Sequence, residues 1–342
     1  MSEANLICVR ISFKFMTNQA RKIGVTGAAG FIGSNLCEAL LLQGSYKIIA
    51  LDNLSTSTEN NLRDILPNKN MAFYQLDITD KRRTANILRG VHTIIHLASY
   101  KIPRYGKRLE TLLLNTKSTE NILDIARNNG AKVIFGSTSD VYGKNPKLPF
   151  KESSDNVLGP PEVARWAYAT SKIFDEHLCF GYWENFGLPF VILRFFNVYG
   201  PRQSRNWLGG PQSLFIDRII SGHEVEIHGT GQQTRAFSYV GDIVKAIIKT
   251  IDESKAIANV INLGSTEEIS VIDLAKLISK LTKLPLKIKK VSYESFTGKT
   301  YEDVLRRYPD VKKAKKILDW QPSTPLIIGL KKTIRWHKQN PI

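Results

Sequence analysis

Tyr168 and Lys172, in the run Tyr-Ala-Thr-Ser-Lys, are residues whose types and spacing suggest chemistry. The surrounding pattern predicts a helix over residues 165–186, and residues four apart on a helix lie on one face. Tyrosine has an ordinary pKa near ~10, and a neighbouring ammonium lowers it by stabilising the phenolate. The pattern therefore predicts Tyr168 as a general base, with Thr138, at the end of a strand, binding the same substrate oxygen.

A glycine-rich turn precedes this pair in the chain, with Gly27, Gly30 and Gly33 spaced as G-x-x-G-x-x-G. A strand-like segment leads into the turn and a helical pattern comes after it, which is the context of a dinucleotide fingerprint. The first glycine permits a tight turn, the second lets backbone approach a pyrophosphate, and the third lets the helix pack on its strand. The helix N-terminus then offers free N–H groups to the phosphates.

Strands and helices alternate through the first part of the chain. Predicted strands cover 22–26, 46–51, 72–76, 93–97, 133–135 and 190–194, and long helices cover 112–128 and 165–186. This alternation favours an α/β fold with a Rossmann-type, doubly wound parallel sheet, whose ligands bind beyond the carboxyl ends of the strands. The residues at those ends are Gly27, Asp52, Asp77, Ala98 and Thr138.

Asp52 ends the second predicted strand, 25 residues after Gly27. A carboxylate near that spacing binds the ribose hydroxyls of adenosine and would repel a 2′-phosphate. The position therefore favours NAD over NADP.

After Asn197 the alternation weakens into shorter elements: helices at 213–221, at 242–251 and from Val271, with strands at 225–227, 235–240 and 260–262. We interpret residues 19–196 as an NAD-binding domain that carries the Tyr–Lys pair. Residues 197–342 are then mainly a smaller mixed α/β substrate-binding domain, with the chain crossing back between the two. Residues 1–18 are interpreted as a disordered extension, or as an artefact of start-site choice with Met16 as the start.

Composition narrows the class of protein. No apolar run reaches the ~18 residues of a membrane span, and the apolar segment 6–16 contains Arg10 and Lys14, so we expect neither a membrane anchor nor a secretory signal. Three widely separated cysteines fit a reducing cytoplasm, and the six histidines show no metal-ligand spacing. The net charge of +17 is concentrated near the C-terminus without a nucleic-acid motif, which we interpret as a solvated helix face.

In combination, these motifs resemble the extended short-chain dehydrogenase/reductases, in the nucleotide-sugar epimerase, dehydratase and decarboxylase group. The resemblance covers about residues 20–340 and rests on GAAGFIG at 27–33, LDNLSTS at 51–57, HLAS at 96–99, STSDVYG at 137–143, YATSK at 168–172, RFFNVYGPR at 194–202 and RRYPDVKKAKKILDW at 306–320. It implies tightly held NAD and a nucleoside-diphosphate sugar, expected to be a UDP-sugar. It also implies a homodimer formed through helices 112–128 and 165–186.

The resemblance also implies residue roles. Cofactor-binding positions are Gly27, Gly30, Phe31, Ile32, Asp52, Asn53, Asp77, Ile78, Leu97, Ala98, Lys101, Tyr168 and Lys172. Within this set, Asp77 and Ile78 would flank the adenine, and Lys101 would lie near the pyrophosphate. Tyr168 would take the proton of a sugar hydroxyl, usually at C4, assisted by Thr138 and Lys172. Substrate-binding positions are Thr138, Asn197, Arg235 and Arg307, with Asn197 at the diphosphate and both arginines around the nucleotide phosphates.

Asp140 bears on the step that comes after oxidation at C4. Family dehydratases carry an Asp-Glu pair where this chain has Ser139-Asp140, which disfavours dehydration. Decarboxylases have Thr-Ser-Glu there, and Arg165-Trp166 is also similar to some UDP-glucuronate decarboxylases. Simple 4-epimerases usually have a neutral residue at this position, but the LDNLSTS, Lys101 and STS segments are most similar to theirs.

The sequence therefore predicts a UDP-sugar 4-epimerase of the UDP-glucose/galactose type, acting through a transient 4-keto sugar. A UDP-glucuronate decarboxylase is the alternative, with Asp140 either catalytic or a structural acid. A dehydratase or a non-catalytic dinucleotide-binding protein is less favoured.

Overall fold

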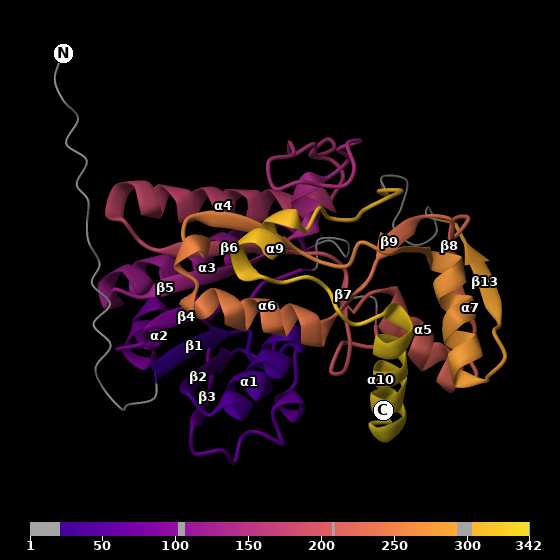
Figure 1. Ribbon diagram of the computed structural model, residues 1–342, viewed down its shortest axis with the longest axis horizontal. Helices are drawn as coiled ribbons and strands as arrows, with labels where there is room; N and C mark the ends of the chain where they lie inside the picture. Colours follow the sequence, from indigo (N-terminus) through magenta and orange to yellow (C-terminus); the bar gives the residue numbers. More distant parts are fainter. Residues whose placement is uncertain (1–20, 102–106, 207–208, 293–302, 342) are drawn as a thin grey trace.

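The computed structural model describes residues 21–101, 107–206, 209–292 and 303–341, so the expected extension over 1–18 lies outside the described residues. A seven-stranded parallel sheet, in the order β11-β6-β5-β4-β1-β2-β3, forms the centre of the molecule (Figure 1). Its strands are β1 (Arg21–Thr26), β2 (Tyr46–Asp52), β3 (Met71–Gln75), β4 (Thr93–His96), β5 (Lys132–Thr138), β6 (Phe190–Phe195) and β11 (Asn259–Leu263). The Rossmann-type α/β fold expected from the alternating pattern is therefore confirmed.

Helices cover both faces of this sheet. On one face, α1 (Phe31–Gln43), α6 (Val240–Asp252) and α9 (Lys312–Leu318) pack against Val25, Ile95 and Leu193. On the other face, α2 (Lys81–Ile87), α3 (Arg108–Asn129) and α4 (Trp166–Phe186) contribute to a second core with Ile94 and Phe135. Because the strands are buried on both faces, they consist of nearly continuous apolar residues, as parallel strands usually do.

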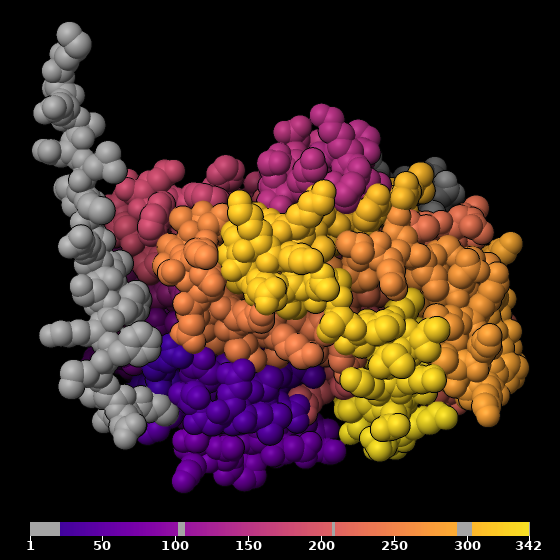
Figure 2. All heavy atoms as spheres, viewed as in Figure 1, coloured from indigo at the N-terminus to yellow at the C-terminus, as the bar shows by residue number. Residues whose placement is uncertain are grey.

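A smaller lobe lies at one end of the sheet, where Figure 1 shows its elements gathered. Its elements are β7 (Val198–Tyr199), α5 (Pro211–Ile220), β8 (Val225–His228), β9 (Thr234–Ala236), β10 (Ser238–Tyr239), β12 (Glu268–Ser270), α7 (Val271–Thr282), β13 (Ile288–Val291) and α10 (Leu326–Gln339). Their apolar side chains form a separate core around Phe215, Leu274 and Leu330. Figure 2 shows this lobe in close contact with the sheet domain, without an extended linker.

The structure corrects one predicted strand and several boundaries. The strand expected at 235–240 is two strands, since β9 pairs with β12 and β10 pairs with β7. The long helices begin at Arg108 and Trp166, and the fifth strand extends from Lys132 to Thr138. The strand expected at 260–262 is β11, which extends the central sheet although it comes after Asn197 in the chain.

Candidate active site

Tyr168 and Lys172 lie on α4 against the carboxyl end of β5. Both side chains are buried, and the hydroxyls of Ser99 and Thr138 lie near the Tyr168 hydroxyl, where they favour its ionised form. The Lys172 ammonium donates to the Gly136 carbonyl over 3.0 Å. One helix and one strand therefore place a phenol, a hydroxyl and an ammonium at a common site, as the sequence predicts.

Burial changes the protonation of this pair. Burial raises the pKa of Tyr168, the Asp140 carboxylate raises it further, and the hydrogen bonds from Ser99 and Thr138 oppose this rise. Burial also lowers the pKa of Lys172. The expected lowering of the Tyr168 pKa is therefore wrong for this arrangement, because desolvation of the phenolate outweighs the groups that stabilise it.

A buried polar network holds the end of β5 in place. Glu176, one turn beyond Lys172, pairs with Arg194 of β6 (Nη2–Oε2 2.6 Å) and accepts a hydrogen bond from Ser137 (2.5 Å). Arg194 also donates to the Tyr142 hydroxyl over 2.9 Å. Because every partner is buried, this network fixes α4 relative to the strand end that carries Thr138.

The glycine turn fits a pyrophosphate. Gly27 has φ +70°, and a Cβ there would lie 2.7 Å from the Ala98 nitrogen. A Cβ at Gly33 would overlap the Gly27 carbonyl, so both positions exclude larger residues. Within the described chain no side chain caps α1, whose N-cap is Gly30. The N–H groups of its first turn, at Phe31 and Ile32, are the expected phosphate donors.

Acidic side chains lie at the end of β2 and just beyond β3, as expected for an adenosine site. Asp52 is buried and accepts hydrogen bonds from the Ala29 nitrogen (3.0 Å), the Leu54 nitrogen (2.9 Å) and the Ser57 hydroxyl (2.8 Å). It therefore ties the glycine turn to the end of β2.

Asn53 donates to Asp77 over 3.0 Å, which brings two of the predicted adenosine residues together. Partial burial opposes ionisation of Asp77, but hydrogen bonds from Thr79 and Asn53 lower its pKa overall. Ile78 beside it is buried.

The segment after β4 connects the two halves of the expected cofactor site. Leu97 and Ala98 are held to β1 through Thr26, whose carbonyl and hydroxyl accept from their nitrogens at 3.1 and 3.3 Å. Lys101 is exposed at the edge of the described residues, and its role near the pyrophosphate stays a prediction.

Asn115 of α3 is buried beside this segment. It accepts from the Tyr100 nitrogen (2.7 Å) and donates to Ser171 of α4 (3.0 Å). It thus braces the loop after β4 against α4.

An arginine cluster, here Arg165, Arg235 and Arg307, meets Asp140 and Asp303 beside Tyr168. Arg307 pairs with Asp140 and also donates to Asn197 over 3.3 Å. Arg165 lies 3.9 Å from Asp140 and 3.7 Å from Asp303, and Arg235 pairs with Asp303 at 3.0 Å. The structure thus brings together the predicted residues Asp140, Asn197, Arg235 and Arg307. Their nucleotide-phosphate and diphosphate roles stay predictions.

Several residues at this site were not among the predicted positions. Asp303 belongs to no motif in the sequence that would have singled it out, and Ser99 ends the HLAS segment but has no predicted role. Arg165 stands in the Arg165-Trp166 pair already noted in the sequence, a signal that points to it without giving it a role at the site. Its guanidinium lies 4.8 Å from the Trp166 ring centroid, an arrangement that holds it over the N-terminal end of α4.

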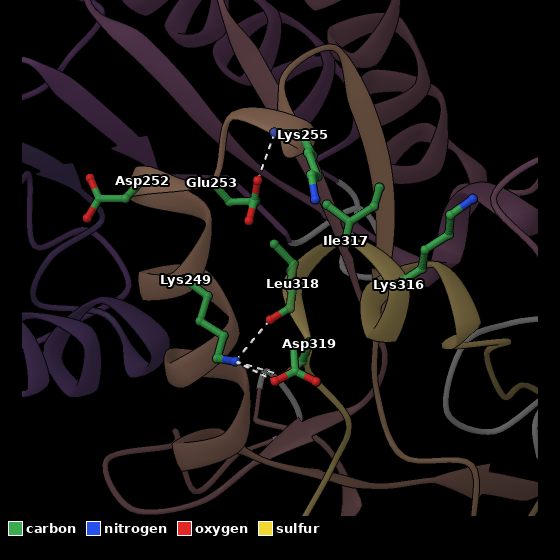
Figure 3. Close-up of a pocket in the computed structure, with 8 residues that line it drawn as sticks. All are labelled: Lys249, Asp252, Glu253, Lys255, Lys316, Ile317, Leu318 and Asp319. Carbon is green, nitrogen blue, oxygen red and sulfur yellow. Dashed lines mark hydrogen bonds and ion pairs between the residues drawn. The ribbon is translucent and has the colours of Figure 1, made fainter. Parts of the chain in front are cut away.

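A surface pocket of about 490 Å³ lies elsewhere, between the end of α6 and α9 (Figure 3). Lys249 crosses it to donate to the carbonyls of Leu318 and Asp319 at 3.0 and 2.8 Å. The pocket lies near the start of β11, whereas Tyr168, Lys172 and Thr138 lie at the carboxyl end of β5. The contacts of Lys249 indicate a structural role, since they bind the last carbonyls of α9.

The described residues contain no cluster of three or more His, Cys, Asp or Glu side chains arranged to hold a metal ion. None of their helices is long and apolar enough to cross a membrane.

Known proteins match nearly the whole of this chain in sequence. A UDP-N-acetyl-alpha-D-glucosaminuronate decarboxylase of Bacillus cytotoxicus is 36% identical over 317 residues, which is 92% of this chain and 97% of the relative. UDP-glucuronic acid decarboxylase 1 of Xenopus tropicalis is 33% identical over 95% of this chain and 74% of the relative.

A solved structure extends the likeness to an epimerase. The UDP-glucuronic acid 4-epimerase of Bacillus cereus, in complex with UDP-glucuronic acid and NAD, superposes with a TM-score of 0.83 at 29% identity over 93% of this chain and 99% of that one. Residues 23–264 match the model of the NAD dependent epimerase/dehydratase family. This chain is therefore a member of the NAD-dependent epimerase/dehydratase family.

Proposed function

We propose that this enzyme decarboxylates a UDP-hexuronate through a 4-keto intermediate. The observation that carries the proposal is the arginine cluster, which places Arg165 and Arg307 around Asp140, next to Tyr168. Guanidinium groups are suited to binding a carboxylate through paired hydrogen bonds. A substrate carboxylate entering here would meet these guanidinium groups while Asp140 holds them in place. The decarboxylase relatives support the same choice.

The first step needs the groups at the end of β5. Tyr168 takes the proton of the C4 hydroxyl, and Thr138 holds the same oxygen by a hydrogen bond. Bound NAD supplies the acceptor for the C4 hydride and later returns it. Lys172 offers a positive charge that favours the phenolate form of Tyr168.

Loss of CO₂ is then a consequence of the position of the ketone. A C4 ketone is β to the carboxyl carbon C6, so the C5–C6 bond breaks and its electron pair moves to the C4 oxygen. Tyr168, now protonated, and Thr138 stabilise the enolate by hydrogen bonding. A proton adds at C5, and reduction of the ketone completes a reaction with no net oxidation.

A 4-epimerase is the second candidate, and the sequence alone favours it. Its support is the LDNLSTS segment and the STS turn, together with the epimerase structure that superposes on this chain. An epimerase would need the keto sugar to turn over in the site, with the hydride returned to the opposite face.

Product analysis separates the candidates. The purified protein is incubated separately with UDP-glucuronate, UDP-N-acetylglucosaminuronate, UDP-glucose and UDP-N-acetylglucosamine, and products are identified by NMR. We expect CO₂ and a UDP-pentose from one of the uronates. Conversion of any of the four UDP-sugars into its 4-epimer, without CO₂ from either uronate, would overturn the decarboxylase in favour of the epimerase.

Asp140 provides a residue-level test of the same proposal. Asp140→Asn removes the charge that orders Arg307 and Arg165, and a hydrogen bond to a charged group is worth about 1.5–3 kcal/mol. We therefore expect kcat/KM for the uronate to fall by about 10- to 100-fold, measured as CO₂ release. Asp155→Asn, in an exposed loop, is the control and should retain full activity. Unchanged kcat/KM in Asp140→Asn would make Asp140 a purely structural acid.

A further inference from the structure

Asp175 is a fully buried carboxylate one turn after Lys172 on α4. Within the described chain, both of its carboxylate oxygens are buried without a partner at hydrogen-bond geometry. A buried charge without hydrogen bonds is costly unless an opposite charge lies close. Residues three apart on a helix are neighbours, so Lys172 is placed to supply that charge.

Among the titratable groups around Asp175 in the described chain, Lys172 is the one that can supply a positive charge. The titratable groups that face it in the described chain are Tyr168, Lys172, Glu176 and Cys179 of α4, and His96 of β4, which reaches it through Thr119 of α3. Glu176 is already bound by Arg194 and Ser137. Burial lowers the pKa of His96 to about 3, so this ring is neutral at ordinary pH.

The protonation of the pair is consistent with this assignment. Burial raises the pKa of Asp175 to about 6, and the Lys172 ammonium, together with the nearby Thr119 hydroxyl, partly offsets that rise. Burial lowers the pKa of Lys172, and the Asp175 carboxylate opposes this effect. At pH 7 Asp175 is therefore ionised, and each partner favours the charged form of the other.

We propose that Asp175 is a positioning residue for the reaction, whose buried carboxylate keeps Lys172 in its ammonium form beneath Tyr168. The ammonium then favours the phenolate needed to take the C4 hydroxyl proton. This inference rests on the proposed role of Tyr168 as base, and it applies equally to decarboxylation and epimerisation. It gives the catalytic pair a third member that touches neither sugar nor cofactor.

The first test is the pH profile of Asp175→Asn, a substitution that keeps the shape and removes the charge. The Asp175 carboxylate raises the pKa of both Tyr168 and Lys172, so its removal lowers both. We therefore expect the alkaline limb of kcat/KM, where the Lys172 ammonium is lost, to move by about one pH unit or more to lower pH. Activity on the alkaline side of neutral pH then falls by about tenfold and recovers as the pH is lowered. Cys179→Ala is the matched control, since it removes an equally buried side chain from the next turn of α4. A folded Asp175→Asn enzyme with the alkaline limb of the parent would overturn the proposal.

The second test needs no substrate and so stands apart from the proposed function. Urea denaturation midpoints are compared for Asp175→Asn, Lys172→Met and the double variant. Each single variant leaves one buried charge alone, so we expect the double variant to lose clearly less than the sum of the two losses. Additive losses would overturn the electrostatic coupling of Asp175 and Lys172. If Asp175→Asn does not fold, the double variant must fold, and its failure to do so also contradicts the proposal.

Discussion

At the scale of single residues, the proposed base, Tyr168, is desolvated, and nearby hydroxyl groups favour its ionised form. Burial opposes ionisation of Tyr168, while Ser99 and Thr138 favour it through hydrogen bonds. The base therefore depends on its surroundings rather than on an intrinsically low pKa. Removing the hydroxyl should be more damaging than altering any one supporting group.

Tyr168→Phe tests this dependence directly. The ring and its packing remain, but the base is lost, so we expect turnover to fall by about 10²- to 10⁴-fold while NAD stays bound. NAD content is measured by absorbance after acid release, and turnover is measured by NMR. Tyr182→Phe is the control, because Tyr182 lies on the same helix with its hydroxyl bonded to Asp124, 2.8 Å away. Undiminished turnover in Tyr168→Phe would remove Tyr168 from the chemistry.

At the scale of elements, the glycine turn and the N-terminus of α1 form one unit. Asp52 binds the turn from β2, and Gly27 and Gly33 let the backbone segments approach closely. A side chain at Gly33 would push α1 away from the turn. The phosphate-facing N–H groups would move with it.

Gly33→Ala should therefore weaken NAD binding by at least about tenfold, since a misplaced helix N-terminus loses aligned donors. The added Cβ would lie 2.8 Å from the Ala28 Cα as well as overlapping the Gly27 carbonyl. Binding is measured by fluorescence titration of the purified variant. Leu42→Ala, at a position of α1 that is 83% exposed, should bind NAD like the parent. Equal affinity in the two variants would contradict the close-packing argument.

Sequence reasoning was sufficient where a signal is local. The Tyr–Lys spacing, the glycine turn and the apolar strands each depend on near neighbours in the chain, and each is confirmed as structure. The split of 235–240 into β9 and β10 could not be found this way, because strand partners are distant in sequence. Asp303 and Asp175 were missed for a similar reason. Asp303 can be recognised only from its ion pair with Arg235, which is distant in sequence. Asp175 can be recognised only from its burial beside Lys172.

At the scale of the whole molecule, two buried histidines link stability to pH. Burial lowers the pKa of His96 and His337 to about 3, with the charges of Lys172 and Arg205 contributing. The unfolded chain therefore binds more protons than the folded one between about pH 6.5 and 3, and stability is lost as the pH falls through that window. Asp175, with its pKa raised to about 6, acts in the opposite direction between about pH 4 and 6.

We expect the free energy of unfolding to fall from pH 7 to pH 5, by up to about 1.4 kcal/mol per pH unit for each histidine once the pH is below 6.5. His337→Leu should reduce this loss, since it removes one of the two groups and leaves Ser213 its bond to the Gln203 carbonyl (3.4 Å). Urea denaturation at both pH values provides the measurement. The same pH dependence in parent and variant would show that His337 does not contribute.

The outer surface of α3 and α4 bears on assembly. Large apolar side chains are exposed on both helices, with Leu109 69%, Leu113 60% and Phe174 51% accessible. The two helices lie side by side along one face of the sheet (Figure 1). Exposed apolar groups of this size on adjacent helices are typical of an interaction surface. We propose that two copies of the chain associate through these helices as a homodimer.

Leu113→Glu should separate that dimer, because each copy would bury a charged side chain against an apolar surface. The expected result is a monomer by light scattering at micromolar concentration, whereas the parent has twice the mass of one chain. Leu42→Glu, on the exposed side of α1, adds the same charge away from α3 and α4 and should remain dimeric. A monomeric parent would overturn the dimer, and a Leu113→Glu variant that stays dimeric would place its interface elsewhere. The Tyr–Lys pair lies on the inner side of α4, so loss of the dimer is expected to lower stability more than turnover per folded chain.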